Sequence, residues 1–407
     1  MKTPLFIFAF FFWLACTRAA DFFWVDAKIN GKNARLILDT GCPRNTVCLF
    51  RPGAERLGLK LDLAESPDSG AGPWWTSAES TLSVRWSFWN CFRARGKLSV
   101  IELPPFVSKD LEAADGAIGL GVIGTRMIEL DAAQRRYRFL QRAPKEEAGW
   151  TRFNIMTNFD ILVLERPDSR EGRDVIIVDT GMQGGGVSLD TERWHLWKTA
   201  HPDQQVTLRF GFLPDAGVFV RECAWAEKLS LGPLELDGVT VEEADPLTSK
   251  IAAKGHAASF GLAAVNRLDF IVDCKHNVAY LRPKKTPPPP SDPARRSLAF
   301  VPRDGRSGDL VARVVDGSPA YNAGVRNGDA LLKVDDRDLA AWRASPGDGW
   351  LINPRTSFAV FTTSSLAKGG LELTVKRGDE TFRANVSPGS VAIFAAPPWT
   401  NSPSGSK

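Results

Sequence analysis

One segment of the chain occurs twice, and this repeat constrains the fold more than any other feature. The letters LILDTG at residues 36–41 return as IIVDTG at 176–181, an offset of 140 residues. AIGL at 117–120 returns as SFGL at 259–262, an offset of 142 residues. An internal repeat of this kind predicts two similar lobes packed about a pseudo-twofold axis.

The repeated region is predicted to be mostly β-structure. Short runs rich in β-branched and aromatic residues alternate with turn signals, and long amphipathic helical periods are scarce. Asn30-Gly31 separates two such runs, at 22–29 and 34–38, and this dipeptide favours a hairpin turn. Further runs lie at 82–89 and 175–178. We therefore expect a mainly β fold.

The composition excludes several classes of protein. The 407 residues are 43% hydrophobic and 24% charged, which is typical of globular domains and not of a disordered scaffold or a polytopic membrane protein. Lys and Arg number 51 against 47 Asp and Glu, a net charge of +4 without any basic run. This excess is too weak to predict a nucleic-acid partner.

The first twenty residues have the pattern of an export signal. Lys2 precedes an apolar run at 5–15 that is too short to span a bilayer, and small residues follow it. We expect residues 1–20 to be a signal peptide and the mature protein to be periplasmic or extracellular. Cys16 also lies in a weak lipobox-like context, with Trp13 where Leu is usual. Attachment to a membrane is expected only if Cys16 is lipidated.

Metal or cofactor chemistry has no support in the sequence. The four His residues form no paired-ligand pattern, and no two Cys residues have the C-x-x-C spacing. We expect neither a metal nor a cofactor. Export permits disulfides, but the pairing of the five mature cysteines stays open. They are Cys42, Cys48, Cys91, Cys223 and Cys274.

A run of four prolines at 287–290 divides the chain. Such a run forms neither helix nor strand and predicts an extended linker. We assign 21–145 to the first lobe, 146–283 to the second, 284–296 to the linker and 297–388 to a separate module. Residues 389–407 are rich in Pro, Ser and Gly, and we expect a flexible tail there.

The two Asp-Thr-Gly triplets predict paired-carboxylate chemistry. An apolar strand that ends in Asp places a carboxylate at the mouth of a sheet, and Gly permits the tight turn behind it. Two carboxylates within about 3 Å of each other cannot both ionise, so they share one proton. The charged one can then act as general base on a water molecule while the protonated one polarises a carbonyl. Asp39 and Asp179 are the candidate pair.

These motifs resemble the retropepsin-like aspartic peptidases, in the bilobal bacterial form with an appended PDZ domain. The resemblance covers about residues 21–283 and implies two tandem acid-protease β-barrel lobes, with Asp39 and Asp179 as the catalytic dyad. The threonines of the triplets are then expected to brace the dyad by hydrogen bonds between the lobes, and the glycines to donate backbone N–H groups towards the carboxylates. These bracing residues are Thr40, Gly41, Thr180 and Gly181.

Two residues depart from the family pattern, in which Ala or Ser usually follows Asp-Thr-Gly. Cys42 follows the first triplet and is nearly isosteric with Ser, although a catalytic thiol is the alternative. Met182 follows the second triplet. Its larger side chain either crowds Asp179 or folds away. In the first case the second triplet would be degenerate, kept for the symmetry of the fold and not for catalysis. The Gly- and Trp-containing residues 69–75 are either a flap over the substrate or a surface loop.

The module after the prolines resembles a PDZ domain. A strand at 310–315 precedes a Ser-Pro-Ala helix start at 318–320, an Ala-Gly turn and a Gly-Asp-initiated strand at 328–334. The resemblance implies an α+β module that captures a C-terminal or internal peptide by adding it as a strand. The alternative is a purely structural module. The residues that match the peptide-binding loop are Ser297, Leu298, Ala299 and Phe300, with Ala299 where Gly is usual.

The sequence thus predicts an exported aspartic endopeptidase that hydrolyses peptide bonds with a water activated by two Asp residues. Its partners would be a polypeptide substrate and a peptide or C-terminus bound by the PDZ domain. The alternative is a catalytically inactive peptide-binding or scaffold protein that retains both folds.

Overall fold

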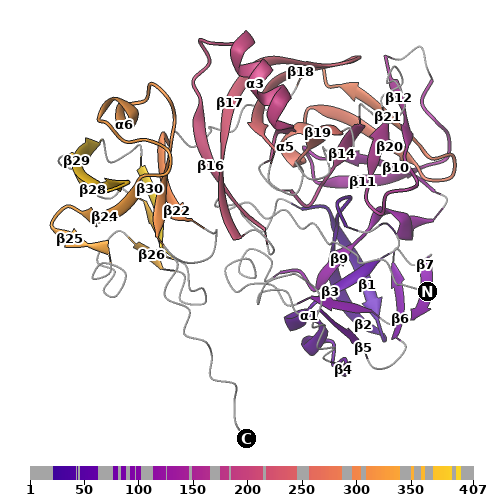
Figure 1. Ribbon diagram of the computed structural model, residues 1–407. Coiled ribbons are helices and arrows are strands. Elements are labelled where there is room, and N and C mark those ends of the chain that lie inside the picture. The colour runs from indigo at the N-terminus through magenta and orange to yellow at the C-terminus, as the bar shows by residue number, and fades with distance from the viewer. Residues whose placement is uncertain are drawn as a thin grey trace, which may run out of the picture. The chain divides into compact units, whose positions relative to one another are not determined.

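A computed structural model of the chain provides the structure (Figure 1). It describes residues 22–42, 44, 46–62, 77–80, 84–88, 92–96, 98–101, 113–124, 126–145, 149–165, 175–182, 185–213, 217–244, 256–286, 296–303, 309–339, 350–352, 359–362, 370–386 and 391–395. The predicted signal peptide, the candidate flap at 69–75, Cys91 and the four prolines lie outside the described residues.

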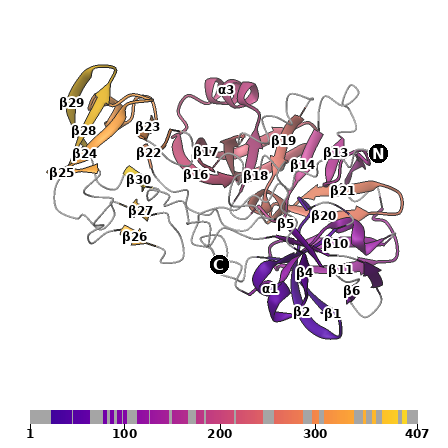
Figure 2. The same ribbon diagram turned by 60° about the horizontal axis from the view of Figure 1, so that its bottom comes forward.

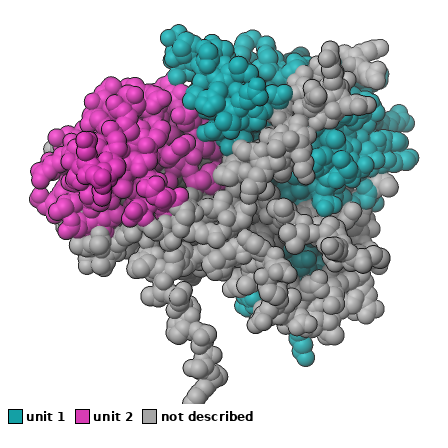
Figure 3. Space-filling model, viewed as in Figure 1, with its two compact units in different colours: residues 1–204, 225–291 teal, residues 205–224, 292–407 magenta. Residues whose placement is uncertain are grey.

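The chain divides into two compact units, which Figure 3 colours separately. Unit 1 comprises residues 1–204 and 225–291, and unit 2 comprises 205–224 and 292–407. Strands dominate both units, so the predicted mainly β class is confirmed. None of the helices in the described part of the chain combines the length and the apolar character that a membrane span requires.

Unit 1 contains two repeats, at 22–140 and at 151–204 with 225–283. The first repeat opens with the Asn30-Gly31 hairpin, in which both turn residues have positive φ (49° and 83°), as the predicted two-residue turn requires. Its elements are β1 (Trp24–Ile29), β2 (Lys32–Leu38), β3 (Val47–Phe50), α1 (Arg51–Arg56), β4 (Leu61–Asp62), β5 (Ser77–Ser80), β6 (Val84–Phe88), β7 (Phe92–Gly96), β8 (Ser99–Ile101), β9 (Gly116–Ile118), η1 (Leu120–Ile123), β10 (Met127–Asp131) and β11 (Arg136–Leu140).

The second repeat has a similar order of strands. Its elements are β12 (Thr151–Ile155), β13 (Val163–Glu165), β14 (Val175–Val178), β15 (Val187–Leu189), α3 (Thr191–Ala200), β18 (Leu234–Glu243), β19 (His256–Phe260), α5 (Leu262–Val265), β20 (Leu268–Asp273) and β21 (Val278–Pro283), together with residues 225–231 of β17 (Gly217–Leu231).

The central strands of the two repeats pair in the same way. In the first, β2 runs parallel to β9, β9 antiparallel to β3, and β3 parallel to β8. In the second, β14 runs parallel to β19, β19 antiparallel to β15, and β15 parallel to β18. Four of these strands, β3, β9, β14 and β15, are wholly buried and almost wholly apolar, as expected for strands covered on both faces. The sequence repeat is therefore also a repeat of topology.

One sheet continues from the first repeat into the second (Figure 2). β10 pairs antiparallel with β20, and Glu129 lies opposite Ile271, its own counterpart at an offset of 142 residues. Two equivalent residues can face each other only on the symmetry axis, so this axis passes between β10 and β20. β10 and β11 precede residue 145, the predicted boundary between the lobes, and share a sheet with β20 and β21.

Unit 2 forms a second β-structure around its own core. Its elements are β16 (Thr207–Leu213) with the first part of β17, and β22 (Leu298–Pro302), β23 (Leu310–Val314), α6 (Pro319–Asn322), β24 (Ala330–Val334), β25 (Arg337–Asp338), β26 (Trp350–Ile352), β27 (Ala359–Thr362), β28 (Leu371–Arg377), β29 (Glu380–Val386) and β30 (Val391–Ala395). Ser318 caps α6, its Oγ accepting from Tyr321 N at 3.3 Å. Buried Asp329 pairs with Arg377 at 2.7 Å.

Residues 391–395 correct one expectation. They lie in the predicted flexible tail but form β30, which pairs with β22 on one side and with β27 on the other. The letters VAIFA in this run favour a strand. The strand was not predicted, because the composition of residues 389–407 as a whole is dominated by Pro, Ser and Gly.

Candidate active site

The repeated topology places Asp39 and Asp179 at equivalent positions. Each follows the last residue of a buried strand, β2 or β14, and is held there by the parallel neighbour of that strand. Asp39 N donates to Ile118 O at 3.0 Å, and Asp179 N donates to Phe260 O at 2.9 Å. Both carboxyl-bearing residues are buried. The apolar-Gly elements of the sequence thus fix the backbone of each aspartate.

The two threonines of the triplets bond each other reciprocally. Thr40 N donates to Thr180 Oγ1 at 3.1 Å, and Thr180 N donates to Thr40 Oγ1 at 3.0 Å. Each hydroxyl then donates to a carbonyl of the opposite repeat, Thr40 Oγ1 to Val178 O at 2.7 Å and Thr180 Oγ1 to Leu38 O at 2.9 Å. These four bonds tie the ends of β2 and β14 together at the base of the two aspartates.

The glycines of the triplets lie directly against the carboxyl groups of the opposite repeat. A Cβ atom on Gly41 would stand 2.5 Å from Asp179 Cγ, and one on Gly181 would stand 2.5 Å from Asp39 Oδ2. No side chain fits at such distances. The close crossing of the two triplets therefore requires glycine at both positions and brings the two carboxyl groups to one site.

Backbone N–H groups surround the carboxyl groups. Gly41 N donates to Asp39 Oδ1 at 2.8 Å. Asp179 Oδ1 accepts from two donors, Gly181 N at 2.9 Å and Met182 N at 3.0 Å. The bond from Met182 N was not foreseen from the sequence, because it depends on how the turn after the triplet closes. These donors stabilise negative charge in a site from which water is largely excluded.

Burial dominates the electrostatics of the pair. It raises the pKa of Asp39, and backbone N–H donors and the bond to Asp179 offset only part of this effect. Burial also raises the pKa of Asp179, and the charge of Asp39 raises it further, to well above the usual range. Both pKa values are thus raised, that of Asp179 further, and the two groups titrate as a pair that shares one proton.

The second oxygen of Asp179 disfavours the charged form of this group. Asp179 Oδ2 is buried and has no hydrogen-bond partner, donor or acceptor, in the described residues. An ionised carboxylate can only accept, so the buried oxygen would have no partner. A protonated Asp179 can instead donate to Asp39. Such a bond stabilises the charged form of Asp39 and the neutral form of Asp179.

Met182 and Cys42 take different places beside the dyad. The Met182 side chain is fully buried and its methyl group lies at Gly261, where a Cβ atom would stand 2.6 Å from Cε. The thioether thus extends towards the apolar-Gly element. Cys42 is buried as well. Its burial, and to a smaller extent the charge of Asp39, raises the pKa of its thiol well above the usual range. A reactive thiolate is disfavoured there.

The residues matched to a peptide-binding loop lie in unit 2, at the start of β22. Leu298, Ala299 and Phe300 are fully buried. β22 pairs with β23 on one side and with β30 on the other, where Leu298 lies opposite Val391. Ser297 precedes the strand, and its Oγ is buried without a partner in the described part of the chain. Both edges of β22 are thus paired with strands of the described residues, and no edge is left for a further strand.

Within the described ranges, no three His, Cys, Asp or Glu side chains gather as a metal would require. Cys42, Cys48, Cys223 and Cys274 form no disulfide with one another. Comparison of the sequence with protein-family models and with curated proteins found no match.

Proposed function

We propose that this chain is an exported aspartic endopeptidase with two retropepsin-like lobes, and that Asp39 and Asp179 form its catalytic dyad. The observation that carries the proposal is the crossing of the triplets, in which each glycine lies against the carboxyl group of the other repeat. Neither repeat has this site alone, because each supplies one carboxyl group and one glycine.

In the proposed mechanism the two carboxyl groups have different roles. Asp39, the charged member, takes a proton from a water molecule whose oxygen attacks the carbonyl carbon of the scissile peptide bond. Asp179, the protonated member, donates its proton to the carbonyl oxygen. The resulting diol collapses when Asp39 gives its proton to the leaving nitrogen and the C–N bond breaks, while one diol hydroxyl returns its proton to Asp179 and becomes the carbonyl oxygen of the product acid. No covalent enzyme intermediate is formed, and the dyad ends with one proton, as it began.

Unit 2 is proposed to be a PDZ domain that recruits a substrate or partner peptide. Support comes from a capped helix after β23, a Gly-Asp turn before β24 and the closing pair β28–β29. Because β30 occupies the edge of β22, a peptide can add beside β22 only if it displaces residues 391–395.

Peptide cleavage by the chain from about residue 21 onward tests the peptidase proposal. A mixed peptide library is incubated across about pH 3 to 8, with and without a statine-type transition-state analogue. We expect cleavage that the analogue blocks and that Asp39→Asn or Asp179→Asn lowers by about 10²–10⁴-fold. Asp309→Asn, at an exposed residue of unit 2, is the matched control and should leave cleavage unchanged.

The same assay separates the proposal from the alternative of an inactive scaffold. No turnover at any pH, together with no binding of the analogue, would mean that both folds are kept without catalysis. Turnover that survives both Asn substitutions would place the chemistry elsewhere in the chain.

A further inference from the structure

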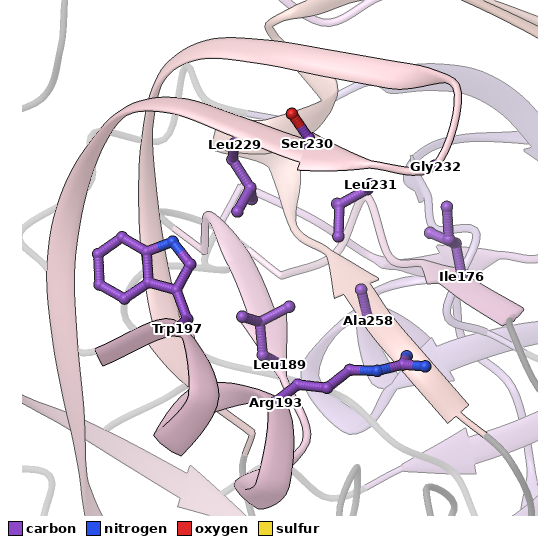
Figure 4. A pocket seen from close by; sticks show the side chains of 9 residues that line it. All are labelled: Ile176, Leu189, Arg193, Trp197, Leu229, Ser230, Leu231, Gly232 and Ala258. Atoms are coloured by element: carbon purple, nitrogen blue, oxygen red, sulfur yellow. The ribbon is translucent and has the colours of Figure 1, made fainter. Parts of the chain in front are cut away.

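The second repeat contains a pocket of about 220 Å³ between α3 and the strands β14, β15, β17 and β19 (Figure 4). Its polar groups do not converge on one ligand. Trp197 Nε1 has no hydrogen-bond partner in the described residues, but this nitrogen is buried, and the guanidinium of Arg193 lies at the opposite end of the pocket. Unit 2, in contrast, contains a binding position together with the segment that occupies it.

This position is a slot for one strand between β22 and β27, which we call the strand slot. β30 fills it, because β22 pairs with residues 391–393 and β27 pairs with residues 392–395. β30 runs parallel to β22 and antiparallel to β27. An occupant of the slot is therefore held through its backbone on both sides, and its direction is fixed.

The strand slot has apolar walls. The letters are LAFVP in β22, AVFT in β27 and VAIFA in β30, and none of the three strands carries a charged residue. Leu298 and Phe300 are fully buried in the core of unit 2, and Ala299 between them is fully buried as well. Because an unpaired charge is costly to bury, an occupant has to be apolar where it pairs with β22.

The segment in the slot is an internal one. The chain continues from Ala396 to Lys407 beyond it, so the paired run does not end in a terminal carboxylate. None of the three strands has a basic residue that would neutralise such a carboxylate. The slot thus fits an extended segment from within a chain better than a chain end.

β30 is also tethered close to the slot. Residues 387–390 alone separate it from the end of β29 at Val386. A segment on so short a linker competes with free peptides at an effective concentration in the millimolar range if the linker is flexible. Free peptides that bind β22 and β27 no better than β30 does are therefore excluded.

We propose that the strand slot is the peptide-binding site of unit 2, that its ligands are internal, extended and apolar segments similar to VAIFA, and that residues 391–395 occupy it as an intramolecular ligand. This inference rests on the proposed recruitment of peptides by unit 2, for which it names the ligand class and the regulation. Binding here requires no cleavage, so its failure and the failure of the dyad proposal are distinguishable.

Truncation of the chain after Val386 tests the proposal, because it removes the intramolecular ligand. Fluorescence anisotropy measures the binding of a labelled peptide with the sequence of residues 387–396, amidated at its C-terminus to imitate an internal segment. Every protein in the test carries Asp179→Asn, which prevents cleavage of the peptide. We expect the truncated chain to bind the peptide at least about tenfold more tightly than the full chain.

Ala392→Pro tests the same point without shortening the chain. Ala392 pairs with Ala299 on one side and with Thr362 on the other, and Pro inside a strand removes a hydrogen bond of the ladder. This variant should also bind the peptide at least about tenfold more tightly. Thr400→Pro, beyond the end of β30, is the matched control and should bind it as the full chain does. Thermal unfolding shows whether each variant is folded.

The outcomes separate the parts of the proposal. Folded variants that bind the amidated peptide no better than the full chain would overturn it. Tighter binding of the same peptide with a free C-terminal carboxylate would show that unit 2 recruits chain ends, so recruitment would stand and the internal ligand class would be wrong. No binding of either form would remove the recruitment as well. A peptide with Ile393→Asp should bind at least about tenfold more weakly, and equal binding would refute the apolar class.

Discussion

The two repeats of unit 1 agree closely around the dyad and differ away from it. Even their peripheral turns match, since Asp131 Oδ1 and Asp273 Oδ1 each accept from the N–H groups two and three residues later. In both turns the fourth residue, Arg135 or Asn277, has positive φ (54° and 51°). These turns close the hairpins β10–β11 and β20–β21, which meet on the symmetry axis.

The repeats differ in the helix that follows β3 in the first repeat and β15 in the second. In the first, the six-residue α1 has no side-chain cap, and its Gly53 lies so close to Asp115 O that a Cβ atom would stand 2.4 Å away. In the second, the ten-residue α3 is capped by Asp190 and carries the tryptophans beside the pocket. The strands that carry the triplets contact each other across the repeats, and their structure is the same in both. The helices α1 and α3 do not take part in this contact, and they differ.

The largest expected effect comes from filling the crossing of the triplets. Gly41→Ala and Gly181→Ala each push a methyl group into the carboxyl group of the other repeat. A displacement of about 1 Å lowers turnover by about 10²-fold, and we expect at least this loss from either substitution in peptide-cleavage assays.

The matched control is Gly370→Ala, where the nearest atom would stand 3.9 Å from the new methyl group. It should leave turnover unchanged. Full turnover in either triplet variant would show that the carboxyl groups do not depend on this crossing.

Substitutions of the two residues that follow the triplets should change the stability of the protein and not its catalytic chemistry. Met182→Ala removes a fully buried thioether that reaches Gly261, and we expect a loss of about 2–5 kcal/mol in the free energy of unfolding. Cys42→Ala removes a single sulfur atom and should cost about 1 kcal/mol. Denaturant unfolding measures both, and equal losses would mean that Met182 does not pack as described.

The threonine bonds should stabilise the two repeats equally. Thr40→Val or Thr180→Val removes a hydroxyl that donates one bond and accepts another, and each should cost about 2–4 kcal/mol. The double variant should lose less than the sum, because the four bonds form one network. Thr40→Ser and Thr180→Ser keep the hydroxyl and serve as controls. If denaturant unfolding showed that the two losses add, the four bonds would not form one network.

The two carboxyl groups should also give a pH dependence of stability that separates them. The folded pKa of each is raised, so stability is fully present below the unfolded pKa and is lost as pH rises through the folded pKa. An Asp→Asn variant lacks the part of this loss that comes from the substituted group. Relative to them, the wild type should lose about 1.4 kcal/mol for each pH unit between the two pKa values.

We expect the gain in unfolding free energy at neutral pH to be larger for Asp179→Asn than for Asp39→Asn, because the pKa of Asp179 is raised further. Thermal or denaturant unfolding at several pH values measures it. The reverse order would assign the proton to Asp39.

Local motifs made part of this structure predictable. The hairpin follows from Asn30-Gly31 alone, and the equivalence of Asp39 and Asp179 follows from the repeat. Features that depend on contacts distant in sequence were not predictable. They include the pairing of β10 with β20 across the expected boundary, the pairing of β30 with β22, and the direction of the Met182 thioether.

The pocket beside α3 also had no signal in the sequence. The letters TERWHLWKTA show two tryptophans on a short helix, but not that one N–H group is buried without an acceptor. The strands β14, β15, β17 and β19 line this pocket together with α3, and the helix sequence does not encode their positions.

A titration of the two side-chain carboxyl groups by ¹³C NMR tests the central claim most directly, namely that Asp39 and Asp179 share one proton. The protein is labelled at the aspartate carboxyl carbons, and the Asp39→Asn and Asp179→Asn variants assign the two signals. We predict that Asp179 stays protonated well above the range of ordinary aspartates and that both signals respond to its titration, because the pair titrates as a unit. Two independent titrations near the ordinary aspartate pKa of about 3.9 would contradict it.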